Sequence, residues 1–261
     1  MPTIEQTVNL RSAFLKTGWA PVIAYGGSVL LYFIGFMIAR HSYSNVNTLL
    51  DSVKWVTVGC PLLILAGYIM SYIGFKQAHR AFGITRAGDA FATLKIIFLI
   101  FTILSAISLI FSIVMISNAS PSTIYVMQAR NIAAVGIIIA AIYLITVVYT
   151  ITALLIIREK MKTIANTTNI DSLEGAYVGA RVIIYTLCTF FVTIIVTGLF
   201  GDKSGAWEYI IFALDFITLF MLLYAIVKWV RGWLGAATEV IRHDVEAEDY
   251  TQQQDNRSTD E

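Results

Sequence analysis

Long apolar runs without a charged side chain, separated by short connections that hold the charges, constrain this chain more than any other feature. A helix that crosses a membrane needs about 20 mainly apolar residues. Six segments meet this requirement: 18–39, 53–75, 96–117, 132–157, 182–200 and 206–230. Charged residues make up only 13% of the chain, against about 25% in soluble domains. The sequence therefore predicts an all-α polytopic membrane bundle of about six transmembrane helices.

The distribution of Lys and Arg predicts how these helices are oriented. Of the 18 Lys and Arg residues, all but Arg40, Lys54, Arg130 and Lys203 fall at one set of helix ends or in the tail after the last helix. Connections rich in Lys and Arg are retained in the cytosol. We therefore expect an integral protein of the cell membrane with both termini in the cytosol.

Four parts are expected along the chain. Residues 1–17 form a cytosolic amphipathic lead-in, and residues 18–230 form the six-span bundle. Residues 231–242 combine tryptophan with branched aliphatic residues, a composition typical of a helix that lies in the membrane interface. Residues 243–261 are acidic and polar. Such a composition cannot bury a core, so this tail is expected to be disordered.

A short pattern recurs where the chain enters the first, third and fifth predicted helices. Segments 90–95 and 176–181 share alanine, an aromatic residue, three variable residues and a cation, and segment 13–16 shares the alanine and the aromatic residue with an earlier cation. One interpretation is a repeat of three tandem helical hairpins. The other is that aromatic anchors and long cations suit any cytosolic helix entry.

Isoleucine-rich spans, a lead-in before each predicted hairpin and compact cytosolic turns make the chain resemble archaeal multi-span membrane proteins of unknown function. The resemblance covers the whole bundle. Because that group has no assigned activity, the resemblance implies a membrane bundle and no particular chemistry.

One ionisable residue falls deep within a predicted span. Asp215 is near the middle of the sixth span, and Glu208 and Thr218 lie on the same helix face. An Asp at the centre of a membrane helix costs about 2.5–3.5 kcal/mol on insertion scales. The face is either a proton or cation site, or Asp215 is protonated and hydrogen-bonded to a neighbouring helix. Thr193 and Thr197 of the fifth span are candidate partners for such a bond.

Small residues predict a packing face in the first span. Ala20, Ala24 and Ser28 recur at every fourth position. This spacing places them in one row along a helix, where they let a second helix approach closely. We expect interhelical packing there and no binding site.

Most kinds of functional site are not expected from this sequence. The two cysteines fall inside apolar spans without metal-ligand spacing, and the three histidines fall in connections or the tail, so neither a metal nor a haem nor another cofactor is expected. No motif of a nucleophilic or metal-dependent enzyme occurs. No basic patch interleaved with aromatic residues indicates nucleic-acid binding.

Two functions remain. The favoured one is a non-catalytic accessory or scaffolding subunit of a membrane assembly, with the lipid bilayer and either other subunits or further copies of the chain as its partners. The alternative is a small channel or transporter for an ion or solute, lined by the polar face around Asp215.

Overall fold

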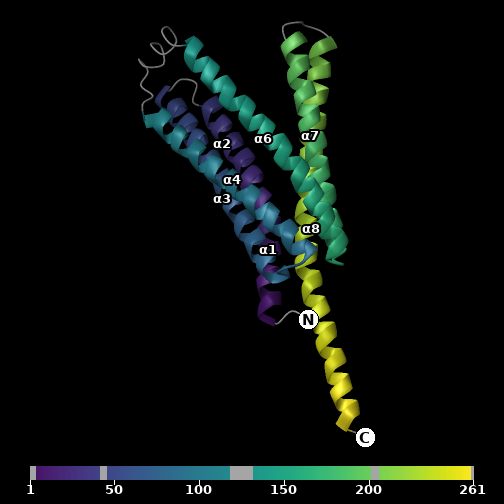
Figure 1. Ribbon diagram of the computed structural model, residues 1–261. Coiled ribbons are helices and arrows are strands. Elements are labelled where there is room, and N and C mark those ends of the chain that lie inside the picture. Colours follow the sequence, from purple (N-terminus) through teal and green to yellow (C-terminus); the bar gives the residue numbers. More distant parts are fainter. Residues whose placement is uncertain (1–3, 42–45, 118–131, 201–205, 260–261) are drawn as a thin grey trace. The chain divides into compact units, whose positions relative to one another are not determined.

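The computed structural model describes residues 4–41, 46–117, 132–200 and 206–259, and every element within these ranges is a helix. Within these ranges, the structure does not describe the side chains of Glu208 or of residues 4–8, 36, 39–41, 46–53, 115, 132–147, 198–200, 206 and 241–259. The elements in chain order are α1 (Ile4–Pro21), the π-helix η1 (Val22–Gly26), α2 (Gly27–His41), α3 (Val46–Phe82), α4 (Arg86–Ser117), α6 (Ile132–Thr167), α7 (Ser172–Phe200) and α8 (Ala206–Thr259) (Figure 1).

Five helical segments of the described chain are long and apolar enough to cross a membrane. They are Asn9–Gly35, Lys54–Phe82, Arg86–Val114, Ser172–Thr197 and Tyr209–Val240. The prediction of an all-helical chain with several membrane-length helices is confirmed. The predicted span 132–157 falls in α6, where many of its side chains lie outside the described residues. A sixth crossing and the cytosolic position of the termini stay predictions.

The chain divides into two compact units. Unit 1 contains Met1–Gly18, Ile73–Lys95 and Leu154–Glu261, and unit 2 contains Trp19–Tyr72 and Ile96–Ala153. Unit 1 therefore holds all three segments in which the alanine–aromatic pattern recurs, although they are far apart in the sequence.

An aromatic cluster forms the core of unit 1. Phe14, Phe75, Phe91 and Trp233 are each 0% exposed. The ring centre of Trp233 lies 5.3 Å from that of Phe14, 5.8 Å from that of Phe75 and 6.4 Å from that of Phe91. Aromatic rings attract each other at such separations and tilts. The aromatic residues of the first two lead-in segments thus pack around one tryptophan of the last helix.

The alanines of the recurring pattern are buried in the same unit. Ala13, Ala90 and Ala176 are each at most 1% exposed. The third aromatic residue, Tyr177, is only half-buried. The shared alanine therefore has a packing role in all three segments, whereas the shared aromatic residue joins the core in two of them. A repeat of three hairpins stays an interpretation of this pattern.

Pro21 ends α1 and is followed directly by the π-helix η1. Proline has no N–H, so it cannot donate the helical hydrogen bond to the carbonyl four residues before it, which belongs to Thr17. The indole nitrogen Nε1 of Trp229 in α8 donates to this Thr17 carbonyl at 3.1 Å. Thr17 and Trp229 both belong to unit 1. A side chain of the last helix thus replaces the backbone bond that the proline removes from the first.

Left-handed residues end the helices at two short turns in unit 1. Gly83 follows α3 with φ +55°, and its N–H donates to the His79 carbonyl at 3.0 Å. Asn169 follows α6 with φ 51°, next to Thr168, whose N–H donates to the Ile164 carbonyl at 3.1 Å. A left-handed residue, usually glycine or asparagine, commonly closes a helix in this way. The short turns let α4 and α7 begin within a few residues.

The last helix continues past the boundaries that are expected after residues 230 and 242. α8 runs without interruption from Ala206 to Thr259 and passes through both the expected interfacial helix at 231–242 and the expected disordered tail at 243–261. Up to Val240, burial accounts for the continuous helix, because Trp233 and Ala236 are fully buried in unit 1 and hold this part of the helix in place. Whether residues 231–242 lie at a membrane interface stays a prediction.

Candidate interaction site on the α7–α8 hairpin

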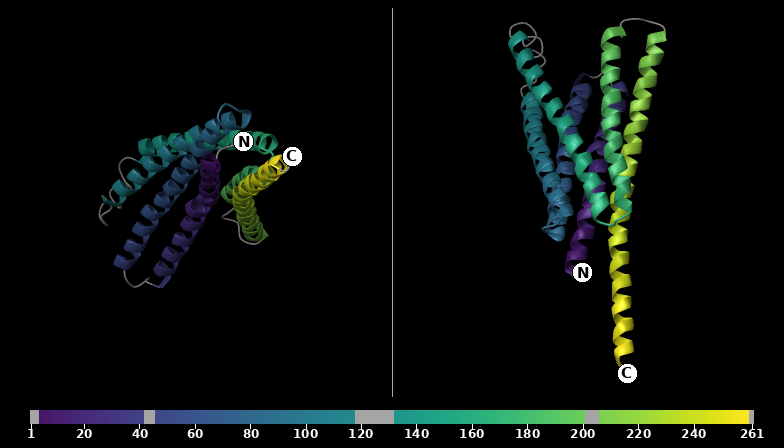
Figure 2. Two further views of the ribbon diagram at one scale, coloured as in Figure 1. Left: turned by 90° about the horizontal axis from the view of Figure 1, so that it is seen from below. Right: turned by 45° about the vertical axis from the view of Figure 1, so that its right-hand side comes forward.

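Glycines bring α7 and α8 close together, and the two helices lie side by side in opposite directions (Figures 1 and 2). A Cβ atom on Gly232 would lie 2.2 Å from the backbone nitrogen of Ala176. A Cβ atom on Gly179 would lie 2.7 Å from the backbone nitrogen of Trp229. Both distances are too short for any side chain, so these positions require glycine. Small residues at such crossings let helix backbones touch.

The carboxylate of Glu239 fixes the start of α7. One of its oxygens accepts a hydrogen bond from the backbone N–H of Asp171 at 3.0 Å, and the other accepts from that of Ser172 at 3.2 Å. The first N–H groups of a helix have no partner within the helix and carry a partial positive charge, so a carboxylate there is stabilising. A side chain of α8 therefore caps α7.

The two halves of α8 differ in burial. Of the described residues 209–224, none is buried, whereas residues 225–240 include buried side chains in every turn. We call residues 209–224 the open half of α8 and residues 225–240 its packed half. The Glu239 cap and the Gly232 crossing both belong to the packed half.

Asp215 lies on the open half, and its side chain is exposed. In the sequence it is midway between Lys203 and Lys228, close to the middle of the expected span. Within the described part of the chain, no hydrogen bond joins the Asp215 carboxyl group to Thr193 or Thr197. Asp215 is thus presented on the surface of the hairpin.

The threonines near this face bond to their own helices. The Thr218 hydroxyl donates to the Leu214 carbonyl at 2.8 Å, and the buried Thr193 hydroxyl donates to the Thr189 carbonyl at 3.0 Å. Thr197 is exposed. The side chain of Glu208, the remaining residue of the expected polar face, lies outside the described residues. The described contacts therefore do not assemble these residues into one polar site.

Three phenylalanines form a row beside Asp215. Phe212, Phe216 and Phe220 are all more than half exposed. The ring centres of Phe212 and Phe216 are 6.2 Å apart, and those of Phe216 and Phe220 are 4.6 Å apart. The surface around the carboxyl group is therefore broad, aromatic and apolar.

The predicted small-residue row of the first span lies in unit 2. Ala20 and Ala24 are both 2% exposed, and a Cβ atom on Gly67 of α3 would lie 2.6 Å from the Ala20 carbonyl oxygen and 2.6 Å from the Ala24 Cβ. The Ser28 hydroxyl donates to the Ala24 carbonyl and lies 3.4 Å from the Cys60 carbonyl of α3. All three residues thus face α3.

The described residues contain no group of three His, Cys, Asp or Glu side chains placed to hold a metal ion. Cys60 and Cys188 are free cysteines. The comparisons with known proteins add nothing to this, since no protein-family model, curated protein or solved structure matches the chain.

Proposed function

We propose that this chain is a non-catalytic subunit of a membrane assembly, and that the open half of α8 is the surface through which it binds another subunit. The observation that carries the proposal is the exposed position of Asp215 on an otherwise apolar surface. Several helices of the described chain are long and apolar enough to cross a membrane, as a membrane subunit requires.

The argument rests on the cost of a carboxyl group in lipid. An Asp at mid-membrane costs about 2.5–3.5 kcal/mol when it faces hydrocarbon, and such residues usually face protein or water. Within the hairpin, Thr193 and Thr218 hydrogen-bond to carbonyl groups of their own helices. A donor side chain from a further membrane helix would satisfy the carboxyl group. Phe212 and Phe216 would pack against that helix.

A channel along the same face is less well supported. Conduction needs a hydrated path, and Asp215 is flanked by the exposed rings of Phe212 and Phe216. These rings suit contact with lipid or with another helix better than contact with water.

Site-specific photocrosslinking tests the proposal. A benzophenone amino acid at Phe216, in the full-length chain expressed in its own membrane, is expected to give one defined adduct. Asp215→Asn keeps a hydrogen-bonding group and should preserve most of the adduct, whereas Asp215→Leu should remove most of it.

The control places the same probe at Phe111 of α4, which is also exposed. Diffuse lipid adducts at both positions, or an adduct at position 216 that is unchanged by Asp215→Leu, would contradict the proposal. Asp215-dependent ion flux by the purified chain in liposomes would favour the channel instead. An adduct of twice the chain mass would identify the partner as a second copy.

A further inference from the structure

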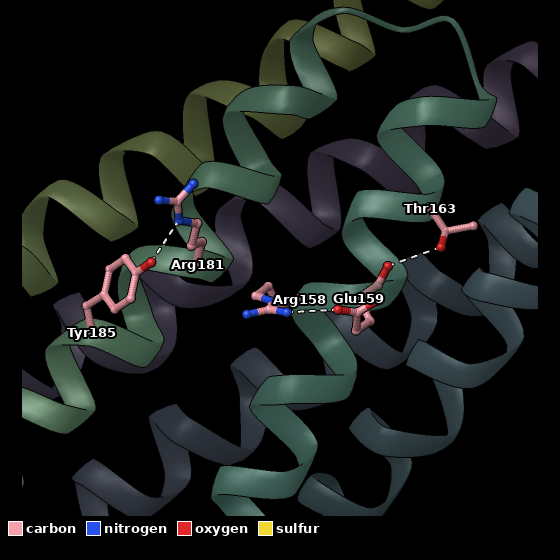
Figure 3. A network of polar contacts seen from close by, with 5 residues as sticks. All are labelled: Arg158, Glu159, Thr163, Arg181 and Tyr185. Carbon is pink, nitrogen blue, oxygen red and sulfur yellow. Dashed lines mark hydrogen bonds and ion pairs between the residues drawn. The ribbon is translucent and has the colours of Figure 1, made fainter.

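Two arginines lie at matching positions on either side of the turn that joins α6 to α7. Arg158 precedes the end of α6 at Thr167 by as many residues as Arg181 follows the start of α7 at Ser172. Both belong to unit 1. Figure 3 shows them on the two neighbouring helices, each with its polar partner.

Within the described part of the chain, the side-chain hydrogen bonds of both arginines go to residues of their own helices. The Arg158 Nη2 atom lies 2.8 Å from Glu159 Oε1, and both side chains are well exposed. This hydrogen bond raises the pKa of the Arg158 guanidinium and lowers the pKa of the Glu159 carboxyl. Arg181 Nε donates to the Tyr185 hydroxyl at 3.1 Å. The Arg181 guanidinium carbon is 5.6 Å from the centre of the Tyr185 ring.

The donors of this pair suit an anion. Because the Tyr185 hydroxyl oxygen accepts from Arg181, its own O–H remains available to donate outward. The terminal nitrogens of a guanidinium form two parallel hydrogen bonds with a phosphate. Tyr185 positions one such guanidinium by hydrogen bond and by its ring face.

The position along the helices suits the phosphate of a lipid. Arg158 directly follows the predicted span 132–157, and Arg181 directly precedes the predicted span 182–200. Both guanidinium groups are therefore expected at the level of the lipid headgroups, where Lys and Arg extend toward the interface. Lys160 and Lys162 add positive charge to the same end of α6. Basic pockets between membrane helices bind anionic headgroups in this way.

We propose that Arg158, Arg181 and the Tyr185 hydroxyl form a binding site for the phosphate group of an anionic phospholipid. Glu159 offsets one of the two positive charges, so the group keeps a net positive charge that attracts an anion. A bound headgroup would thereby hold α6 and α7 together at the membrane interface.

Native mass spectrometry of the full chain, released from nanodiscs of phosphatidylcholine with a minor share of phosphatidylglycerol, tests this site. The wild type should retain phosphatidylglycerol selectively. The double variant Arg158→Gln/Arg181→Gln should retain about tenfold less, the order expected when charge-assisted hydrogen bonds are lost. Tyr185→Phe keeps every charge and should reduce retention about threefold.

The matched control, Arg80→Gln/Arg86→Gln, removes two exposed cations from the same unit that belong to neither α6 nor α7. Equal retention by the wild type and the arginine double variant would overturn the proposal, as would an equal loss in the control. If the arginine double variant fails to fold, Tyr185→Phe decides, and unchanged retention in that variant overturns the site. Displacement of the lipid by excess inorganic phosphate would overturn the lipid assignment, whereas resistance to phosphate supports it.

Discussion

The packed and open halves of α8 use the same spacing of residues for opposite purposes. In the packed half, Ala225, Trp229 and Trp233 recur every fourth position and all are buried. In the open half, Phe212, Phe216 and Phe220 recur every fourth position and all are exposed. Periodicity alone therefore does not tell which face of a membrane helix meets protein.

The packed and open halves of α8 differ in the small residues that lie beside each row of side chains. The packed half carries Gly232 beside its tryptophans, and Gly179 of α7 lies against Trp229, so the two backbones can approach. The open half has no glycine in its sequence. Bulky side chains keep a neighbouring helix at a distance, and the row then remains available to lipid or to a partner. Small residues distinguish the two halves better than hydrophobicity does.

The largest effect should follow from Trp233→Ala. Trp233 is fully buried and contacts Phe14, Phe75 and Phe91, so truncation leaves a large cavity in the core of unit 1. We expect the free energy of unfolding to fall by about 3–5 kcal/mol. Titration with a denaturing detergent, followed by circular dichroism, measures this change.

Phe212→Ala on the open half is the control for the tryptophan. Phe212 is 69% exposed, so its truncation should change the free energy of unfolding by less than about 0.5 kcal/mol. If Trp233→Ala and Phe212→Ala lowered the free energy of unfolding equally, the packed half would not contribute more to stability than the open half.

Gly232→Leu should give the next largest effect. Its side chain would meet the backbone of Ala176, which cannot move aside as a flexible side chain could. We expect about 3 kcal/mol of destabilisation, at the upper end for overpacking. Ala213→Leu adds the same side chain to an exposed position of the open half and should be nearly neutral. A tolerated Gly232→Leu would show that α7 and α8 are not in close contact at this crossing.

Much of the fold follows from the sequence because the period and length of apolar segments are local properties. The membrane-length helices at 53–75 and 96–117 and the small-residue row at Ala20 and Ala24 could be predicted in this way. The burial of Trp233 in unit 1 could not, because it depends on residues more than a hundred positions away. An interfacial helix and a buried helix end have similar compositions.

For the candidate site on the α7–α8 hairpin, the residue types could be predicted from the sequence, but their exposure and contacts could not. The sequence singled out Asp215 as an ionisable residue, and this residue lies in the long apolar segment Tyr209–Val240. Its exposure on the hairpin depends on which face of α8 meets α7, and Gly179 and Gly232 set that face. The Glu239 cap also escaped prediction, since it joins residues 67 and 68 positions apart in the sequence.

The smallest expected effect in this series concerns the hydrogen bond that links the two ends of the chain. Trp229→Phe keeps an aromatic ring in the packed half but removes the donor to the Thr17 carbonyl. A carbonyl left without a partner costs about 1–3 kcal/mol, so we expect a loss of about 1–2 kcal/mol in the same unfolding titration.

Pro21→Ala supplies the control, because alanine restores a backbone N–H four residues after Thr17. In that background the Thr17 carbonyl has a second donor, and Trp229→Phe should cost about 1 kcal/mol less than it does in the wild type. An equal cost in both backgrounds would mean that Trp229 acts through packing alone. A reduced cost would show that the proline of the first helix and the tryptophan of the last compensate for each other, so that the packed half of α8 also stabilises the start of the chain.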